Sequence, residues 1–163
     1  HTVDLCQWAA QKDDTAPVSY ESDGSGVIAH YADGLKMVMR VDGWMGMGTC
    51  SARYEGDEGW IETGDSGKFA IYPESLRTER TVFTRAGTDP TTHIRNFLDC
   101  VKTGKAPNAN SDVAAQSHVA CHAAYIAWQM GRKLEFDPVA EEFLNDDEAN
   151  RMRSRAMRDP WRL

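Results

Sequence analysis

The sequence of 163 residues has few of the features that define metal, redox or membrane proteins. It contains four cysteines but no C-x-x-C pair, which argues against a zinc knuckle or a thioredoxin-type site. No apolar run approaches the roughly 20 residues that a membrane-spanning helix needs. Positive charge is scarce, with 18 Lys and Arg against 25 Asp and Glu and a net charge of −7. This balance disfavours nucleic acid as a general partner and favours solubility.

Several nucleotide and protease motifs are also missing. No strand is followed by G-x-G-x-x-G and a helix, and the Gly-rich run GWMGMG (43–48) has no Lys-Ser/Thr after it. We interpret 43–48 as a loop, with a mobile apolar rim over a pocket or partner as the alternative. His118 is followed by Val119 rather than Glu, so the zinc-protease signature is absent. The sequence predicts no bound metal, and it predicts that the four cysteines are buried free thiols.

The first half of the chain predicts short strands. Leu35, Met37 and Met39 alternate with Lys36 and Arg40, which is the period-two pattern of a half-buried strand. The segments expected as strands are 17–22, 27–32, 35–42, 50–55, 59–63 and 68–72. The dipeptide at 33–34 is Asp-Gly and predicts a type I′ hairpin turn, and 56–59 predicts a second, slightly longer turn. Connections this short join antiparallel neighbours, so we expect an antiparallel meander.

Helical patterns occupy the two ends of this region. Residues 1–10 read as a short helix. Asp89-Pro90 predicts the start of another helix, in which Ile94, Phe97, Leu98 and Val101 recur at helical spacing before Gly104 ends it. An Ala-rich helix is expected from about 111 to Gly131, then a brief strand at RKLEF and a short helix in DDEANRMRSR. Strands first and helices later predict an α+β fold with helices on one face of the sheet.

Two sets of histidines are candidates for chemistry. On a helix, His1, Asp4 and Trp8 share one face, and the dipole at the helix start favours a neutral imidazole that accepts or hands on a proton. A tag remnant or a frayed end is the alternative for His1. His118 and His122 have the i, i+4 spacing of a chelating pair, but without a third ligand we interpret them as a polar helix face. His93, just before an apolar stripe, is a weaker candidate for a pocket.

The last residues, RMRSRAMRDPWRL, hold five Arg and one Trp. That composition can mimic a nucleic-acid patch. The preceding DDE and the negative charge of the whole chain instead favour a solvated, locally paired helix face.

Five stretches in order resemble one family over the whole chain. HTVDLCQWA, EGDEGWIE, HIRNFLDCVKTGKAP, SHVACHAAYIAWQMGRKLEFDP and DDEANRMRSRAMRDPWRL are similar to the C-terminal domain of bacterial Gfo/Idh/MocA (glucose–fructose oxidoreductase/inositol dehydrogenase) proteins. The resemblance implies an open, mostly antiparallel sheet with helices on one face, like the C-terminal domain of dihydrodipicolinate reductase. It also implies that an N-terminal Rossmann domain for NAD or NADP is absent from residues 1–163.

Further expectations about the site follow from this resemblance. His1 looks like the histidine of the family's D-x-x-x-H pair and is the expected catalytic residue, with Asp4 and His93 as substrate contacts. The parent protein would move a hydride between NAD(P) and a sugar or polyol carbon, and some relatives use NAD to cleave glycosides instead. This chain alone would be inactive and would bind no dinucleotide. An independent sheet module that binds a ligand or partner without chemistry is the alternative.

The resemblance and the apolar pattern together predict self-association. Whichever face of 27–32 and 35–42 meets the helices, the other keeps apolar members such as Ile28 with Val38. Family members pair these sheets face to face, so we expect a homodimer or higher homo-oligomer. No membrane partner is expected. The compartment stays open, with the cytoplasm slightly favoured and the periplasm possible.

Overall fold

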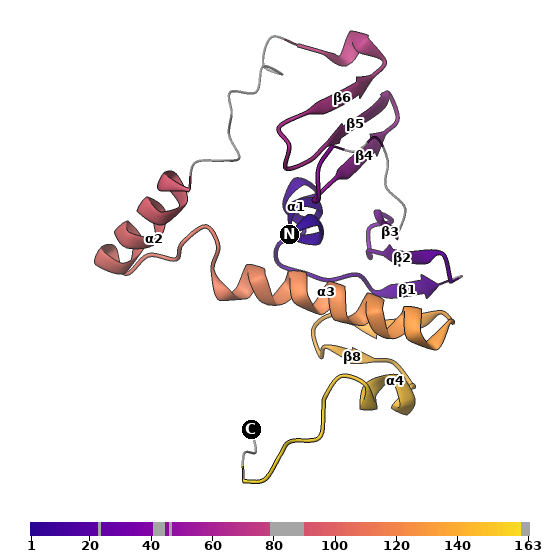
Figure 1. Ribbon diagram of the computed structural model, residues 1–163. Coiled ribbons are helices and arrows are strands. Elements are labelled where there is room, and N and C mark those ends of the chain that lie inside the picture. Colours follow the sequence, from indigo (N-terminus) through magenta and orange to yellow (C-terminus); the bar gives the residue numbers. More distant parts are fainter. Residues whose placement is uncertain (23, 41–44, 46, 79–89, 161–163) are drawn as a thin grey trace. The chain divides into compact units, whose positions relative to one another are not determined.

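The computed structural model describes residues 1–22, 24–40, 45, 47–78 and 90–160. The chain divides into two compact units. The first comprises residues 1–11 and 42–114, and the second comprises residues 12–41 and 115–163. Helices and open antiparallel sheets make this an α+β protein, as the sequence predicts (Figure 1).

The second unit contains a five-stranded antiparallel sheet in the order β3-β2-β1-β7-β8. Its strands are β1 (Ser19–Ser22), β2 (Gly26–His30), β3 (Lys36–Arg40), β7 (Leu134–Asp137) and β8 (Glu142–Phe143). The expected strand at RKLEF is therefore present as β7. It pairs with β1 and not with β6, the strand that precedes it in the sequence. Most of helix α3 (Ser111–Met130) and the short helix α4 (Asp147–Arg151) belong to the same unit.

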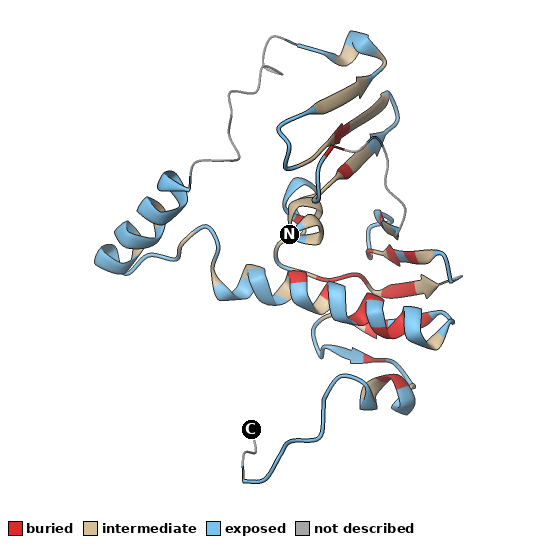
Figure 2. Ribbon diagram, in the orientation of Figure 1, coloured by how far each residue is buried: buried red, intermediate tan, exposed pale blue. Residues whose placement is uncertain are grey.

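The core of this unit lies between α3 and one face of the sheet. Buried residues gather on one side of α3 and on the strands (Figure 2). The alanines of α3 that the sequence marks for close packing, Ala120, Ala124 and Ala127, are all buried. Tyr20 is fully buried against Phe136, with an edge-to-face ring separation of 5.9 Å. Burial, with Tyr31 and Cys121 of α3 nearby, raises the pKa of Tyr20, so its hydroxyl stays protonated.

The period-two pattern correctly assigns the faces of β3. Met37 is buried and Met39 half-buried, while Val38 is 53% exposed beside its cross-strand partner Ile28. The turn before β3 corrects the sequence prediction, since only Gly34 has positive φ, at 93°. The Gly34 N–H donates to the Tyr31 carbonyl, and the Tyr31 N–H donates to the Leu35 carbonyl. This is a three-residue connection with a bulge at glycine, not a two-residue type I′ turn.

The first unit contains a separate three-stranded antiparallel sheet, β4-β5-β6. Its elements are α1 (Thr2–Ala9), β4 (Ala52–Gly56), β5 (Gly59–Thr63), β6 (Phe69–Tyr72), the 3₁₀ helix η1 (Glu74–Leu76) and α2 (Thr91–Thr103). The expected single meander is thus wrong, because the strands form two sheets. Hairpin periodicity fixes neighbouring pairs but not whether successive hairpins join.

Turns and helix ends in this unit follow local sequence rules closely. Gly56 pairs with Gly59, so the connection between β4 and β5 has two residues and is shorter than expected. Gly104 ends α2 in the left-handed region at φ 68°, where glycine carries no Cβ penalty. Pro90 precedes the first helical residue, whereas Asp89, expected as the cap, lies outside the described residues. The last helix, α4, covers only part of the stretch that the sequence assigns to it.

Candidate functional site

The strongest sequence candidates, His1 and Asp4, lie on the exposed side of α1. His1 occupies the N-cap position, its carbonyl accepts from the Leu5 N–H at 2.9 Å, and its side chain makes no capping bond. Asp4 is exposed in the first turn, where a carboxylate complements the positive end of the helix dipole. Trp8 on the same side is 66% exposed. The predicted grouping of an imidazole, a carboxylate and an indole on one helical face is therefore present.

The opposite side of α1 packs against β4 and holds the helix in place. Gln7 is fully buried, and the Tyr54 hydroxyl donates to the Leu5 carbonyl at 3.5 Å. Burial raises the pKa of the Cys6 thiol, although a hydrogen bond with Tyr54 partly opposes the shift. Burial likewise raises the pKa of Tyr54 to about 12, with the Cys6 sulfur adding to the effect. Both groups are neutral near pH 7, so this contact anchors α1 without adding charge beside His1.

The third candidate stands on another element. His93 is exposed in the first turn of α2, just before Ile94 begins the apolar stripe of that helix. The structure groups His1 and Asp4 on α1, and His93 is not part of that group. Its assignment as a substrate contact stays a prediction.

The histidine pair of α3 forms a polar surface, as the sequence suggests. The imidazoles of His118 and His122 are exposed and stack at 5.9 Å. Within the described residues, no three His, Cys, Asp or Glu side chains gather closely enough to hold a metal ion. The cysteines are free thiols, but none is fully buried and Cys121 is exposed, which corrects the expected burial.

A buried ion pair on the β4-β5-β6 sheet escaped the sequence analysis. The Glu62 side chain is fully buried, and its Oε2 accepts from Arg53 Nε at 3.0 Å and Nη2 at 2.8 Å. Its Oε1 accepts from the Met45 backbone N–H at 2.6 Å. The Arg53 guanidinium lies 4.3 Å from the centre of the Trp60 ring, and Trp60 stacks on Tyr72 at 6.1 Å. The hairpin register, which sets Arg53 opposite Glu62, is the signal that reveals this pair.

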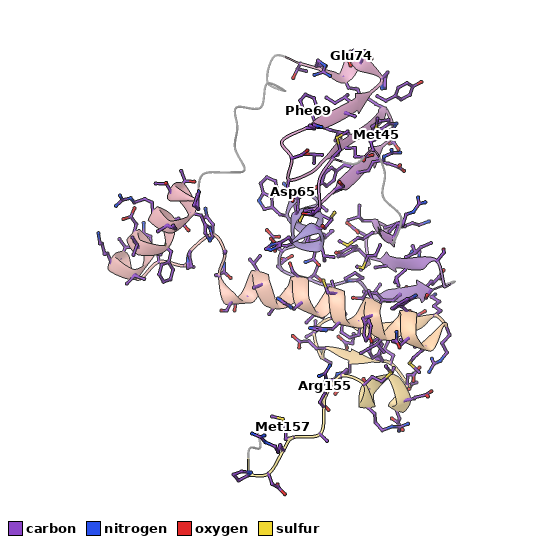
Figure 3. All side chains as sticks on the ribbon, viewed as in Figure 1. Met45, Asp65, Phe69, Glu74, Arg155 and Met157 are labelled. Carbon is purple, nitrogen blue, oxygen red and sulfur yellow. The ribbon has the colours of Figure 1, made fainter. Side chains whose placement is uncertain are left out.

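Two further contacts attach the loop before β4 to the same sheet. The Asp65 carboxylate accepts from the Thr49 backbone N–H at 2.7 Å and from the Thr49 hydroxyl, which lowers the pKa of Asp65. The Met47 carbonyl accepts from the Ser66 N–H at 3.1 Å, and the Met47 side chain is buried. Figure 3 labels Met45, Asp65, Phe69 and Glu74 in this unit. The described part of the predicted loop at 43–48 is thus fixed to β5 and its following turn.

The fold and the exposed start of α1 define the class: an α+β domain of open antiparallel sheets with helices packed against them. The model of the Gfo/Idh/MocA oxidoreductase family, described as its C-terminal alpha/beta domain, matches residues 1–163. The chain belongs to this family. No curated protein and no solved structure matches it. No helix in the described part of the chain is long and apolar enough to cross a membrane.

The family is typically NAD(P)-dependent, which raises the question of whether these residues fit a dinucleotide. A Rossmann site rests the pyrophosphate on a Gly-rich turn between a parallel strand and a helix N-terminus. The strand pairs of the described residues are all antiparallel, and none of their strands leads through such a turn into a helix. The described residues therefore do not fit the phosphates of a dinucleotide bound in this way.

Proposed function

We propose that residues 1–163 are the substrate and oligomerisation domain of an NAD(P)-dependent oxidoreductase that acts on a sugar or polyol hydroxyl or ketone. The observation that carries the proposal is the family match over the whole chain. In this proposal, the cofactor domain consists of residues outside this sequence. An exposed imidazole at the start of α1 supplies the acid–base group that hydride transfer at a carbinol carbon requires.

His1 is proposed to move the proton of the reacting hydroxyl. Its side chain makes no capping bond, so it is free to face a substrate. Asp4, one turn further along the exposed side of α1, is proposed to bind a neighbouring hydroxyl of the substrate. His93 is proposed as a further substrate contact, at the start of α2.

The test uses the full-length protein encoded by the parent reading frame. His1→Ala should lower kcat by about 10²–10⁴-fold, the usual contribution of general acid–base assistance, while dinucleotide affinity changes little. Trp8→Phe on the same helix is the matched control and should keep turnover. Unchanged turnover in His1→Ala removes His1 from the catalytic role. A full-length protein that neither binds nor reduces a dinucleotide favours the non-catalytic sheet module.

The same experiment separates two reactions within the family. A dehydrogenase accumulates reduced dinucleotide in proportion to the product, which absorbance follows directly. A glycosidase that oxidises transiently and reduces back releases sugar without net reduction of the cofactor. The proposal favours net hydride transfer.

We also propose that two copies pair through the sheet face of β1-β2-β3 that lies opposite α3. Ile28 and Val38 are cross-strand partners on this face and are 38% and 53% exposed. Pairing buries both side chains and needs only a two-fold axis. Val38→Asp should convert the dimer to monomer in light scattering at tens of micromolar. Val139→Asp, at a 92% exposed valine beyond β7, is the control and should leave the dimer intact. A wild-type monomer refutes the pairing.

A further inference from the structure

Residues 152–160 form an exposed basic segment, called here the arm. Each of these residues is exposed, and Figure 3 labels Arg155 and Met157 on the chain that follows α4. The base of the arm is fixed, because Arg153 donates to Asn150 Oδ1 at 3.0 Å and pairs with Glu142 at 3.2 Å. The arm holds three Arg, two Met and a single Asp, in a chain whose net charge is −7.

The arm is rich in two residue types that favour interfaces. Arg and Met are enriched in the buried centres of protein–protein contacts, where Lys, Glu, Asp, Ser and Ala are depleted, and five of the nine arm residues are Arg or Met. Segments that stay disordered are instead rich in Pro, Glu, Ser, Gln, Lys and Gly. The arm lacks Glu, Lys, Gln and Gly and contains one Ser and one Pro. Its surroundings in the complete assembly should therefore be negatively charged and able to accept guanidinium and thioether groups.

The three-stranded sheet presents a surface with those properties. Glu55, Trp60 and Tyr72 stand in one cross-strand row on β4, β5 and β6, and Asp57 and Glu58 form the adjoining turn. We call these five residues the aromatic–acidic face. Tyr72 is 63% exposed at the edge strand, and Glu55, Asp57 and Glu58 are exposed as well. Neighbouring positions in such a row lie about 5 Å apart, so one extended segment spans them.

This face already binds one arginine of its own chain. The Arg53 guanidinium stacks on Trp60 at 4.3 Å and lies 3.8 Å from the Glu55 carboxylate. The buried Glu62 holds Arg53 in that position. Trp60 therefore has Arg53 on its ring, and Tyr72 continues the stack toward the sheet edge. An added guanidinium on Tyr72, close to the acidic turn, repeats an arrangement that the sheet already contains.

We propose that the arm of one copy docks on the aromatic–acidic face of a second copy. Arg155 and Arg158 stack on Tyr72 and pair with the acidic turn, and Met157 contacts the ring edge. The second copy is the occupant because the basic, thioether-bearing arm and the acidic, aromatic face are complementary in charge and chemistry, which lets two copies of one chain bind each other. Two-fold symmetry lets each copy receive the other's arm, so the contact forms twice. These residues are distinct from the sheet face that carries Ile28 and Val38.

A cross-linking experiment on the full chain tests the docking. Met157 is replaced by the photoreactive p-benzoylphenylalanine in a tagged copy, which is mixed with an untagged copy and irradiated. The expected product is a tagged–untagged pair, with the cross-link mapped by mass spectrometry to residues 55–60 or 72. Raising salt from about 0.15 M to 1 M should weaken it, because the screening length falls from about 8 Å to 3 Å. Cross-links only within one chain, or at other sites, overturn the proposal.

Charge reversal tests the partners in trans. R155E/R158E in the tagged copy should reduce the cross-link at least about tenfold, since each lost contact is worth about fivefold. Tyr72→Ala in the untagged copy should reduce it similarly, whereas Trp8→Ala, on the helix that packs against the same sheet, should not. Mixing R155E/R158E with D57R/E58R should restore the product. An unchanged yield in the first variant, or no restoration in the mixture, refutes the pairing. At a protein concentration raised to compensate for the lost sheet pairing, V38D should still give the cross-link at residues 55–60 or 72, which separates the weaker arm contact from that pairing.

Discussion

Removing Arg53 should destabilise the three-stranded sheet far more than removal of an ordinary surface arginine. Arg53 makes two charge-assisted hydrogen bonds to Glu62 Oε2, at 3.0 and 2.8 Å, and the glutamate is fully buried. In Arg53→Ala, the Met45 N–H at 2.6 Å is the one donor to this carboxylate that remains among the described residues. Hydrogen bonds to charged groups contribute about 1.5–3 kcal/mol each, and breaking one partner of a buried pair costs about 3–5 kcal/mol. We therefore expect about 3–5 kcal/mol of lost unfolding free energy.

Urea unfolding followed by circular dichroism measures the loss, and hydrogen exchange should locate it in residues 52–72. Glu55→Ala is the matched control, because that carboxylate is 65% exposed and lies 3.8 Å from Arg53, and it should cost less than about 1 kcal/mol. The double variant Arg53→Met with Glu62→Leu should cost less than the sum of the two single changes, because no charge is left buried. A loss below about 1 kcal/mol in Arg53→Ala would refute this account of the pair.

Further expectations follow from single positions. Gly34→Ala should cost about 1–2 kcal/mol in thermal unfolding, because φ is 93° there, and Gly34→Asn should cost less. The Arg132 hydrogen bond lowers the pKa of Asp146 to about 2. The stabilisation from this lowered pKa is fully present above the unfolded-state pKa of about 3.9 and disappears as the pH falls toward about 2. Asp146→Asn should therefore weaken the pH dependence of the melting temperature between about pH 4 and pH 2. Phe97→Ala, at an exposed ring, should cost less than about 1 kcal/mol in urea unfolding. Phe136→Ala, at a ring 4% exposed, should cost about 3–5 kcal/mol, and equal costs would contradict the burial described.

Local features of the fold were predictable because they depend on neighbours in the sequence. Met37 and Val38 lie on opposite faces of β3 because side chains alternate along a strand, and Gly104 ends α2 because it adopts positive φ without strain. The division into two sheets was not predictable in this way. It depends on the pairing of β7 with β1, more than a hundred residues away in the sequence. The hairpins of β4, β5 and β6 form a sheet of their own.

The candidate site shows the same limit. Helical spacing placed His1, Asp4 and Trp8 on one exposed face of α1, which needs only the 3.6-residue period. The burial of Glu62 was not predictable, because alternation along β5 places a residue on one face of the sheet without showing what covers that face. Met45 forms part of that cover, since its backbone N–H donates to the carboxylate. Such burial depends on tertiary packing.

Exposed apolar side chains link the fold to the proposed assembly. Ile94, Phe97 and Val101 form one stripe of α2 and are 51%, 56% and 66% exposed, and Tyr125 and Trp128 on α3 are 54% and 44% exposed. A 13-residue helix is marginal by itself in water, so it gains most of its stability when an apolar face is buried. Aromatic and branched residues at these exposed positions favour burial against a partner surface. In the proposed larger, oligomeric oxidoreductase, further domains or copies would bury such side chains.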